Sequence, residues 1–387
     1  MSSSSNLKQS ELTHPKLIAH PLALSDREEE VLYFNGDSYF RDLGTALNSA
    51  THRVDLEFYI FNLDPLGLRI LDLLVHAANR GVDVRVLIDA FGSPAWTQDD
   101  IKIHSARGVQ VRVYNAIKLD SFLSTLQKLN KRNHRKTCII DGRIAYLGSM
   151  NMSAVHLTEF HGEKAWRDTG VRIFGPAVAI LQMSFEQAWN PHKSSMYYWL
   201  LWKMRKLLPN ILQINSTSFL RLKYHQTLIQ KIKTARGRIW ITNAYFVPDA
   251  RVTSALKHSA EKNHVDVRIL IPRKSDILFM TWVGHIFYRS LLNSGVRIFE
   301  YLPSVLHAKT LIVDDWAIVG TSNFDRRSFF HDLEADVVLN SLQAKSALAD
   351  QFELDLKSSQ EIFISDIGRF WLQNIFGRIF FIFRYWL

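Results

Sequence analysis

Cysteine is almost absent from this chain, because Cys138 is the only one among 387 residues. A single thiol can form neither an intramolecular disulfide nor a thiolate metal cluster, and it is compatible with a reducing compartment. Long hydrophobic runs are also missing: no stretch reaches the roughly 18–20 uninterrupted apolar residues of a spanning helix. The polar start, MSSSSNLKQSELTHP, has no apolar segment of the kind found in secretory signals. We therefore expect any membrane contact to be peripheral.

Acidic residues are outnumbered by basic ones, since 37 Asp and Glu face 47 Lys and Arg and give a formal net charge of +10. A surplus of this size favours polyanionic partners, either nucleic acid or an anionic lipid surface. Charge alone does not choose between the two. Metal-ligand patterns such as H-E-x-x-H or clustered Cys and His are absent from the sequence as well. The sequence therefore predicts no metal and no other cofactor.

A repeat of three strand-like blocks dominates the sequence, with the same order in both halves. Each block is short, apolar and rich in β-branched residues, as expected of strands buried on both faces. Because solenoid repeats have much shorter periods, a repeat of this length indicates a duplicated domain. The paired blocks are RVDLEFYIF (53–61) and RIWITNAYF (238–246), GVDVRVLID (from Gly81) and HVDVRILIP (from His264), and GVQVRVY (from Gly108) and GVRIFEY (from Gly295).

Helix-like stretches separate these blocks. LGLRILDLLVHAANRG (66–81) has apolar residues at helical spacing and ends in a glycine suited to a C-cap, and ARVTSALKHSAEKN occupies the same place in the second half. Strand, helix and strand in each half predict an α/β fold with a mostly parallel sheet flanked by helices. We expect lobes at residues 29–193 and 218–360, a connecting segment at 194–217 and a tail at 368–387.

The same short pattern follows the third block of each half, reading H-R-K-T-C-I-I-D in the first and H-A-K-T-L-I-V-D in the second. Residues two apart on a strand share a face, so the histidine and lysine of each pattern point the same way. A lysine can neutralise phosphate oxygens while a neutral imidazole attacks phosphorus or donates a proton. The hydroxyl and amide of a following Gly-Ser/Thr-x-Asn turn could bind the same oxygens. The candidate catalytic residues are therefore His134, Lys136, Asp141, His307, Lys309 and Asp314, and the candidate phosphate-binding residues are Ser149, Asn151, Thr321 and Asn323.

The aspartates that complete the two patterns differ from the histidines in orientation. Asp141 lies seven residues after His134, so on a continuous strand it faces away from that histidine. Asp141 and Asp314 belong to the motif, but their odd spacing from the histidines places them on the opposite face of the strand. We therefore expect them to have an architectural role. A carboxylate farther along each half is better placed to hold the imidazole. We assign Asp168 to orient His134 and Glu334 to orient His307.

The first half carries an insert before its motif, at residues 115–132, that the second half lacks. The insert is basic and amphipathic. Because long inserts near a site are often functional, it could be a lid or a lipid-entry element beside His134. A surface helix without a role is an equally good interpretation.

Aromatic and cationic residues are interleaved in the connecting segment 194–217 and in the tail 368–387, which reads GRFWLQNIFGRIFFIFRYWL. Aromatic rings at the headgroup level with Arg and Lys near anionic phosphates are typical of an interfacial anchor. Core-packing helices are the alternative for both segments. A nucleic-acid groove would more often show spaced aromatics in a basic surface than such dense apolar clusters. We therefore favour an anionic phospholipid membrane as the partner and expect no nucleic acid.

The paired motifs resemble the HKD motifs of the phospholipase D superfamily, and the resemblance extends from about Val31 to Leu339. The segments NHRKTCIIDGRIAYLGSMNMSAVH, WRDTGVRIFGPAV and AYFVPD are further similar to bacterial cardiolipin synthases of the short type without N-terminal transmembrane helices. The resemblance implies two lobes related by a pseudo-twofold axis, with one metal-free active site at their interface.

The resemblance also implies a two-step transfer. His134 would attack the lipid phosphate to form a phosphatidyl-histidine, while His307 would protonate the leaving alcohol and then activate the acceptor hydroxyl. The implied reaction is cardiolipin synthesis from phosphatidylglycerol, with phosphatidylethanolamine as another candidate donor. The implied location is the cytoplasmic side of a bacterial inner membrane. Phospholipase D and nuclease-type phosphodiesterase activities of the same superfamily are the alternatives.

Overall fold

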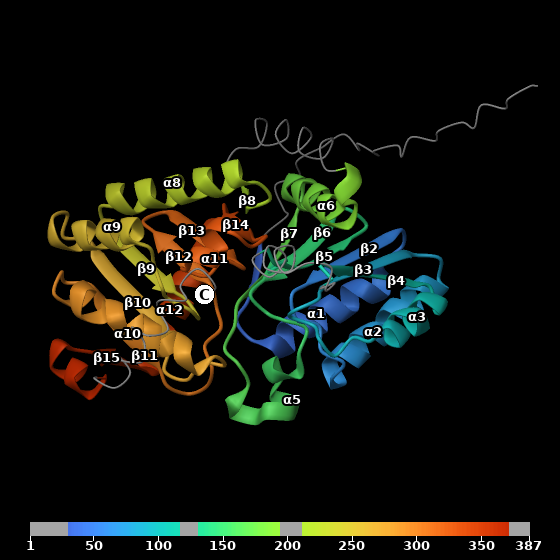
Figure 1. Cartoon of the computed structure of the whole chain (residues 1–387), viewed down its shortest axis with the longest axis horizontal. Coiled ribbons are helices and arrows are strands. Elements are labelled where there is room, and N and C mark those ends of the chain that lie inside the picture. The colour runs from blue at the N-terminus through green and yellow to red at the C-terminus, as the bar shows by residue number, and fades with distance from the viewer. Residues whose placement is uncertain (1–29, 117–130, 194–210, 371–387) are drawn as a thin grey trace, which may run out of the picture.

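Each half of the chain folds into its own lobe, built on a β-sheet with helices packed against it (Figure 1). The computed structural model describes residues 30–116, 131–193 and 211–370. The three repeated blocks become three adjacent parallel strands in each lobe. These strands are β2 (Arg53–Phe58), β3 (Asp83–Asp89) and β4 (Val109–Tyr114) in the first lobe, and β9 (Arg238–Thr242), β10 (Asp266–Pro272) and β11 (Arg297–Tyr301) in the second.

Both sheets are mixed, so the expectation of mostly parallel sheets holds only for the repeated blocks. Tight turns join β5 to β6 and β12 to β13, and such turns permit only antiparallel pairing, whereas parallel strands need a long crossover. The strand orders are β1-β7-β6-β5-β2-β3-β4 and β15-β11-β10-β9-β12-β13-β14-β8. The remaining strands are β1 (Val31–Tyr33), β5 (Lys136–Ile140), β6 (Ile144–Gly148), β7 (Gly170–Phe174), β8 (Leu212–Ile214), β12 (Thr310–Val313), β13 (Trp316–Gly320), β14 (Ala335–Leu339) and β15 (Ser359–Ile362).

The crossover helices form where the sequence predicts them, at α2 and α9. An aspartate caps each: Asp64 accepts from the backbone N–H of the first turn of α2, and Asp249 does the same for α9. The helices are α1 (Gly36–Ser49), α2 (Pro65–Asn79), α3 (Gln98–Ala106), α5 (Thr158–His161), α6 (Pro176–Trp189), α8 (Ser218–Thr234), α9 (Ala250–Glu261), α10 (Leu278–Leu292), α11 (Arg326–Phe330) and α12 (Leu342–Lys357), with 3₁₀ turns η1 (Ala154–His156), η2 (Gly162–Lys164), η3 (Pro191–Lys193) and η4 (Ile364–Phe370).

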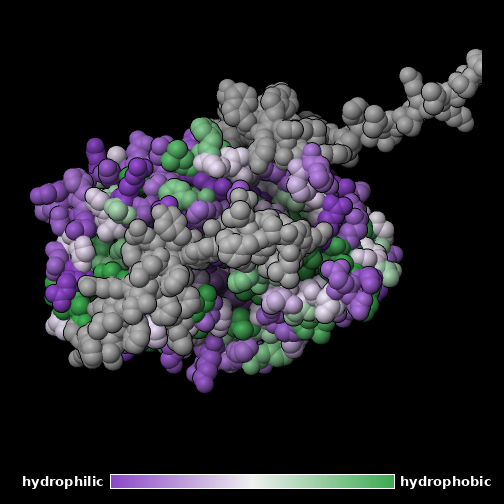
Figure 2. Space-filling model, in the orientation of Figure 1, coloured by the Kyte–Doolittle hydropathy of each residue, from purple (hydrophilic) through white to green (hydrophobic). Residues whose placement is uncertain are grey.

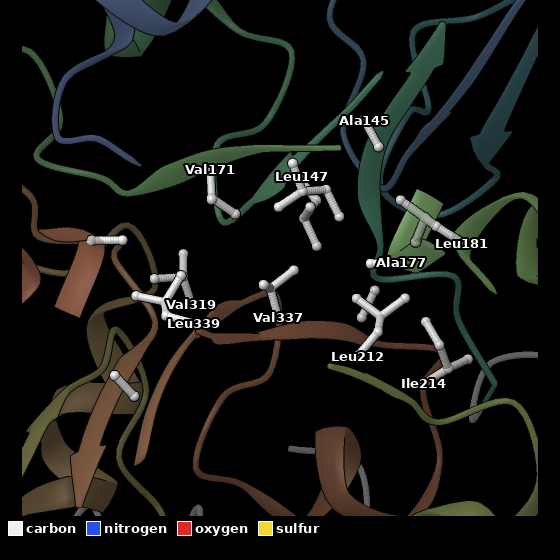
Figure 3. Close-up of a cluster of buried hydrophobic side chains, with 14 of the residues drawn as sticks. Ala145, Leu147, Val171, Ala177, Leu181, Leu212, Ile214, Val319, Val337 and Leu339 are labelled. Carbon is white, nitrogen blue, oxygen red and sulfur yellow. The ribbon is translucent and has the colours of Figure 1, made fainter. Parts of the chain in front are cut away.

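A shared apolar core joins the two sheets (Figure 3). Leu147 of β6 and Val171 of β7 come from the first lobe, while Val319 of β13 and Val337 of β14 come from the second. All four side chains are completely buried, and burying such a side chain contributes about 1.5–3 kcal/mol. The core therefore holds the motif-bearing hairpins of both lobes against each other.

Three segments expected to have special roles lie largely outside the described residues. These are residues 117–130 of the insert, residues 194–210 of the connecting segment and the tail from residue 371. The described end of the connecting segment contains β8, which pairs with β14 and so extends the second sheet. Within the described residues, no helix is both long enough and apolar enough to cross a membrane.

Candidate active site

The two motif histidines occupy matching places, each just before a strand at the lobe interface. His134 precedes β5 and His307 precedes β12. The His134 N–H donates to the Leu333 carbonyl oxygen (3.0 Å), and the His307 N–H donates to the Arg167 carbonyl oxygen (2.8 Å). Because the same exchange occurs in both directions between the lobes, the site lies on a pseudo-twofold axis. The expected location of the site at the lobe interface is therefore met by the geometry.

Each imidazole is oriented by a carboxylate from the opposite lobe. His307 Nδ1 lies 2.8 Å from Asp168 Oδ2, and His134 Nδ1 lies 3.0 Å from Glu334 Oε1. The sequence-based pairing of Asp168 with His134 and of Glu334 with His307 is therefore wrong, since the partners are exchanged. The cause is topological: the residues that precede β7 and β14 cross the interface and pair with the histidine segment of the other lobe.

This arrangement sets the tautomer and charge of both rings. Nδ1–H donates to the carboxylate, so Nε2 carries the lone pair that faces the reacting atoms. Burial lowers the pKa of both histidines, and the neighbouring lysine charges lower it further. Before a phosphate binds, both imidazoles are therefore neutral, the form that a nucleophile or base requires.

The motif lysines lie beside the imidazoles with strongly perturbed ionisation. Lys136 Nζ donates to the His134 carbonyl oxygen at 2.7 Å, and Lys309 Nζ donates to that of His307 at 2.6 Å. Lys309 Nζ is also 3.0 Å from His307 Nε2. Burial lowers the pKa of Lys136 to about 7 and that of Lys309 to about 8. A bound phosphate would reverse this shift, because an anion stabilises the charged ammonium.

The hydroxyls of the Gly-Ser/Thr-x-Asn turns bind the orienting carboxylates. Ser149 Oγ donates to Asp168 Oδ1, and Thr321 Oγ1 donates to Glu334 Oε2. In this structure the carboxylates therefore occupy these hydroxyls, and their expected contact with phosphate oxygens stays a prediction. Both are completely buried behind the carboxylates, and a carboxylate is the stronger acceptor available to them.

Gly148 explains why these turns begin with glycine. Its φ is +145°, and a Cβ built there would lie 2.4 Å from the Thr169 carbonyl oxygen. Any larger residue would push β6 away from β7. The close approach allows the Ser149 N–H to donate to the same oxygen at 3.0 Å, next to Asp168. The glycine thus keeps the hydroxyl and the carboxylate in contact.

Asn151 and Asn323 are both almost completely buried. The Asn151 N–H donates to His156 Nε2 (3.2 Å), and the Asn323 N–H donates to Ser328 Oγ (3.1 Å). Their side-chain oxygens have no hydrogen-bond partner among the described residues. Only the NH2 end of each amide can donate to a phosphate oxygen, so the unpaired oxygens do not test the expected phosphate contact, which stays a prediction.

The motif aspartates lie in turns away from the imidazoles, as parity predicts. Asp141 has a φ of 53° and Asp314 a φ of 51°, each just after its motif strand. The Asp141 carboxylate accepts from the backbone N–H groups of residues 51–53, and that of Asp314 accepts from residues 236–238. These bonds lower the pKa of both carboxyl groups, against the opposing effect of their partial burial. Their membership of the candidate catalytic set is not supported by the geometry, which gives them a structural role.

Sequence reasoning missed His156 and its counterpart in the second lobe. His156 follows Asn151 by five residues, as Ser328 follows Asn323. Ser328 Oγ donates to Glu334 Oε1 at 2.7 Å, whereas His156 Nδ1 lies 3.8 Å from Asp168 Oδ2. Aligning the two halves beyond the motif would have revealed both positions.

Aromatic rings near the histidines were also missed. The Tyr59 ring lies 5.0 Å from His134, and the Trp166 ring lies 5.6 Å from His307, between ring centroids. Both lie next to a strand, Tyr59 in the first repeated block and Trp166 at the start of WRDTGVRIFGPAV, but neither belongs to the paired motifs. They form apolar walls that strengthen electrostatic interactions in the site.

Among the described residues, no group of three or more His, Cys, Asp or Glu side chains is placed to hold a metal ion. The phosphate-directed groups at the interface are instead two neutral imidazoles and two lysines, matched across the pseudo-twofold axis.

Comparison with known proteins agrees with this geometry. The family model described as cardiolipin synthase, PLD-like domain matches residues 43–189 and 228–356. The chain is 32% identical to the probable cardiolipin synthase YwiE of Bacillus subtilis, over 85% of this chain and 66% of that protein. It is 31% identical to a cardiolipin synthase of Clostridium perfringens, over 92% of this chain and 75% of that protein.

A solved structure supports the fold independently. The phosphatidylserine synthase of Haemophilus influenzae superposes with a TM-score of 0.68 at 13% identity, covering 93% of this chain and 95% of that chain. At such low identity this likeness concerns the fold alone, and it matches the two-lobed arrangement seen here. The family match and the identity to relatives cover most of both lobes and both motifs. The chain belongs to the cardiolipin synthase family of phospholipase D-like proteins.

Proposed function

We propose that the chain makes cardiolipin by transferring a phosphatidyl group from one phosphatidylglycerol to the hydroxyl of another. The observation that carries this proposal is the matched pair of carboxylate-held imidazoles at one interface. The family assignment gives the substrate class, because the relatives named above are cardiolipin synthases. A nuclease or hydrolytic phosphodiesterase is not favoured by these relatives.

In the first step, His134 Nε2 attacks the phosphorus of the donor lipid. A P–N bond forms, the bond from phosphorus to the glycerol headgroup oxygen breaks, and His307, which takes up a proton on Nε2 when the anionic phosphate binds, gives that proton to the oxygen. His134 suits the nucleophile role because its side chain is more exposed than that of His307, at 12% against 4%. His307 Nε2 is already in contact with Lys309 Nζ, which suits a group that exchanges protons.

In the second step, His307 takes the proton of the acceptor hydroxyl. The acceptor oxygen attacks phosphorus, the P–N bond breaks, and His134 leaves as a neutral imidazole. Lys136 and Lys309 stabilise the charge on the non-bridging oxygens in both transition states. Glu334 and Asp168 keep each ring in place and stabilise the imidazolium that forms on it.

Association with an anionic membrane is part of this proposal. The net charge of +10 favours such a surface, and both substrates are membrane lipids. The proposed anchors are residues 194–210 of the connecting segment, since β8 at its end is part of the second sheet, and the tail 368–387, at the cytoplasmic side of a bacterial membrane. Phosphatidylethanolamine remains a second candidate donor, because the transferred phosphatidyl group is the same.

Purified protein incubated with headgroup-labelled phosphatidylglycerol tests the function. We expect labelled glycerol to be released in step with the appearance of cardiolipin. Phosphatidic acid as the main product would indicate hydrolysis and would contradict the transferase proposal. His134→Ala is the control, since it removes the attacking nitrogen and should abolish both products.

A further inference from the structure

A cavity lies at the junction of the lobes, and none of the motif histidines and lysines lines it. Its volume is about 510 Å³, and it lies between α6 and the start of α8. Arg135 and Leu333 belong to its wall, and they are the chain neighbours of His134 and Glu334. The cavity is therefore directly behind the segment that holds the first imidazole.

The described wall of this cavity is rich in hydrogen-bond donors and contains no carboxylate. Three cations line it, from different parts of the chain: Lys131, Arg135 and Arg221. Hydroxyl groups from α6 and from the residues that open α8 complete the wall. Arg135 is ion-paired with Glu57, which lies outside this wall, but three cations and no acid in the wall itself favour an anion.

The N-terminus of α8 adds to this preference. The helix has 17 residues, and its first turn has no acidic residue to balance the positive end of the helix dipole. Thr217 caps the helix by accepting from the Leu220 N–H, and Thr217 and Ser218 both line the cavity. Helix N-termini of this kind are frequent binding places for phosphate groups.

An unsatisfied buried hydroxyl gives independent support for a ligand. Ser184 of α6 lines the cavity and is completely buried, and its Oγ has no hydrogen-bond partner among the described residues. Leaving such a group unpaired costs about 1–3 kcal/mol. The nearby Gln187 side-chain oxygen is unpaired as well. A ligand with several acceptor oxygens would satisfy the hydroxyl, and the Gln187 amide could turn to donate.

Arg135 is fixed in position before any ligand arrives. Its guanidinium donates to the Ser184 carbonyl oxygen (3.2 Å), to Ser216 Oγ (3.0 Å) and to Glu57 Oε1 (3.3 Å). These bonds join both lobes around the cavity. A preorganised cation loses little entropy on binding, which favours affinity.

We propose that this cavity binds a phosphate group, presented either by a phospholipid headgroup or by a free phosphate ester. Phosphate fits better than a carboxylate, because its three or more oxygens can accept from several donors at once. The site is separate from the catalytic one and does not depend on the proposed reaction. A bound phosphate would connect α6 and α8 through Arg135, next to His134.

Ser218→Glu is the sharpest variant for testing this site. Ser218 is exposed at the first turn of α8, where a carboxylate stabilises the helix but repels an anion. Leu342→Glu is the matched control, because it places the same charge at the first residue of α12, which also has no acid in its first turn. Lys131→Gln provides a second variant at an exposed position of the wall.

The full-length chain would be titrated calorimetrically with inorganic phosphate and, separately, with monomeric short-chain phosphatidylglycerol. We expect at least one probe to bind, with affinity about tenfold weaker in Ser218→Glu and weaker in Lys131→Gln, but unchanged in Leu342→Glu. Binding of both probes indicates that the phosphate suffices, and binding of the lipid alone indicates a headgroup site. Crystals soaked in the binding probe should show it beside Arg135. Equal affinity in all variants, or density only between the two motif histidines, would overturn the proposal.

Discussion

Two half-sites with the same plan differ at a few residues. Asp168 is held by Ser149 and faces His156, and its interactions with His307, His156 and Lys309 lower its pKa despite complete burial. Burial instead raises the pKa of Glu334 to about 7. Asp168, the carboxylate that orients His307, therefore stays ionised more readily than Glu334. This difference suits His307 to the proton-transfer role, in which an imidazolium must be stabilised.

Exchanging the orienting carboxylates for amides should separate the two pairs. Glu334→Gln and Asp168→Asn should each lower kcat by about 10³- to 10⁴-fold, because an amide permits the wrong tautomer. Nitrogen NMR of the histidine rings reports their tautomers. Glu334→Gln should change the tautomer of His134, and Asp168→Asn should change that of His307. The opposite assignment of the two changes would contradict the crossed pairing.

The pH dependence of kcat/KM should report the two lysines. Their charged form binds phosphate, and the pKa values of about 7 for Lys136 and about 8 for Lys309 mean that protons are lost as pH rises through this range. kcat/KM should therefore fall above pH 7–8, while the acid limb, set by protonation of the His134 nucleophile, lies below the usual histidine range because burial lowers the pKa of that histidine.

Lys309→Arg provides the control for this assignment. An arginine stays charged throughout the accessible range, so whatever activity the variant retains should show its alkaline limb shifted upwards. An alkaline limb in the same place as in the original protein would assign the titration to another group.

At the level of elements, the repeated blocks and the crossover helices were predictable because local patterns determine them. The strands at 53–58, 83–89 and 109–114 and helix α2 fall where periodicity and capping residues place them. Parity along a strand also predicted the orientation of Asp141. The crossed carboxylates were not predictable, because aligning two halves cannot tell which lobe receives a segment that crosses a symmetry axis.

Asp141→Ala tests the architectural role of the motif aspartates. The change removes an acceptor for the backbone N–H groups of residues 51–53, at the start of β2. We expect the free energy of unfolding to fall by about 1–2 kcal/mol, a small value because the turn is exposed to water. Activity per folded molecule should change little, as judged by denaturant unfolding together with the transfer assay. Loss of activity to the extent seen in His134→Ala, with stability unchanged, would give Asp141 a catalytic role instead.

At the level of the whole molecule, neither lobe contains a complete half-site. The His134 imidazole needs Glu334 from the second lobe, and the His307 imidazole needs Asp168 from the first. The shared core fixes this exchange, since Leu147 and Val337 pack together across the interface. Activity therefore depends on the lobes staying docked.

The space-filling view shows hydrophilic and hydrophobic residues interspersed over the described surface on this face (Figure 2).

Deletion of residues 368–387 tests the proposed membrane anchor. The deletion should weaken sedimentation with vesicles of phosphatidylglycerol far more than it slows transfer on detergent-dispersed lipid, because only the first assay needs a membrane surface. Vesicles of neutral phosphatidylcholine serve as the control for charge. An equal loss in both assays would mean that the tail is part of the folded core.

Trapping the covalent intermediate is the most direct measurement. The chain would be mixed briefly with phosphatidylglycerol labelled in the phosphate, quenched in base and digested for mass spectrometry. The label should be found on the peptide that contains His134, as a phosphoramidate that is stable in base and lost in acid. Label on a serine or a carboxylate, or cardiolipin formation at full rate in His134→Ala, would contradict the account.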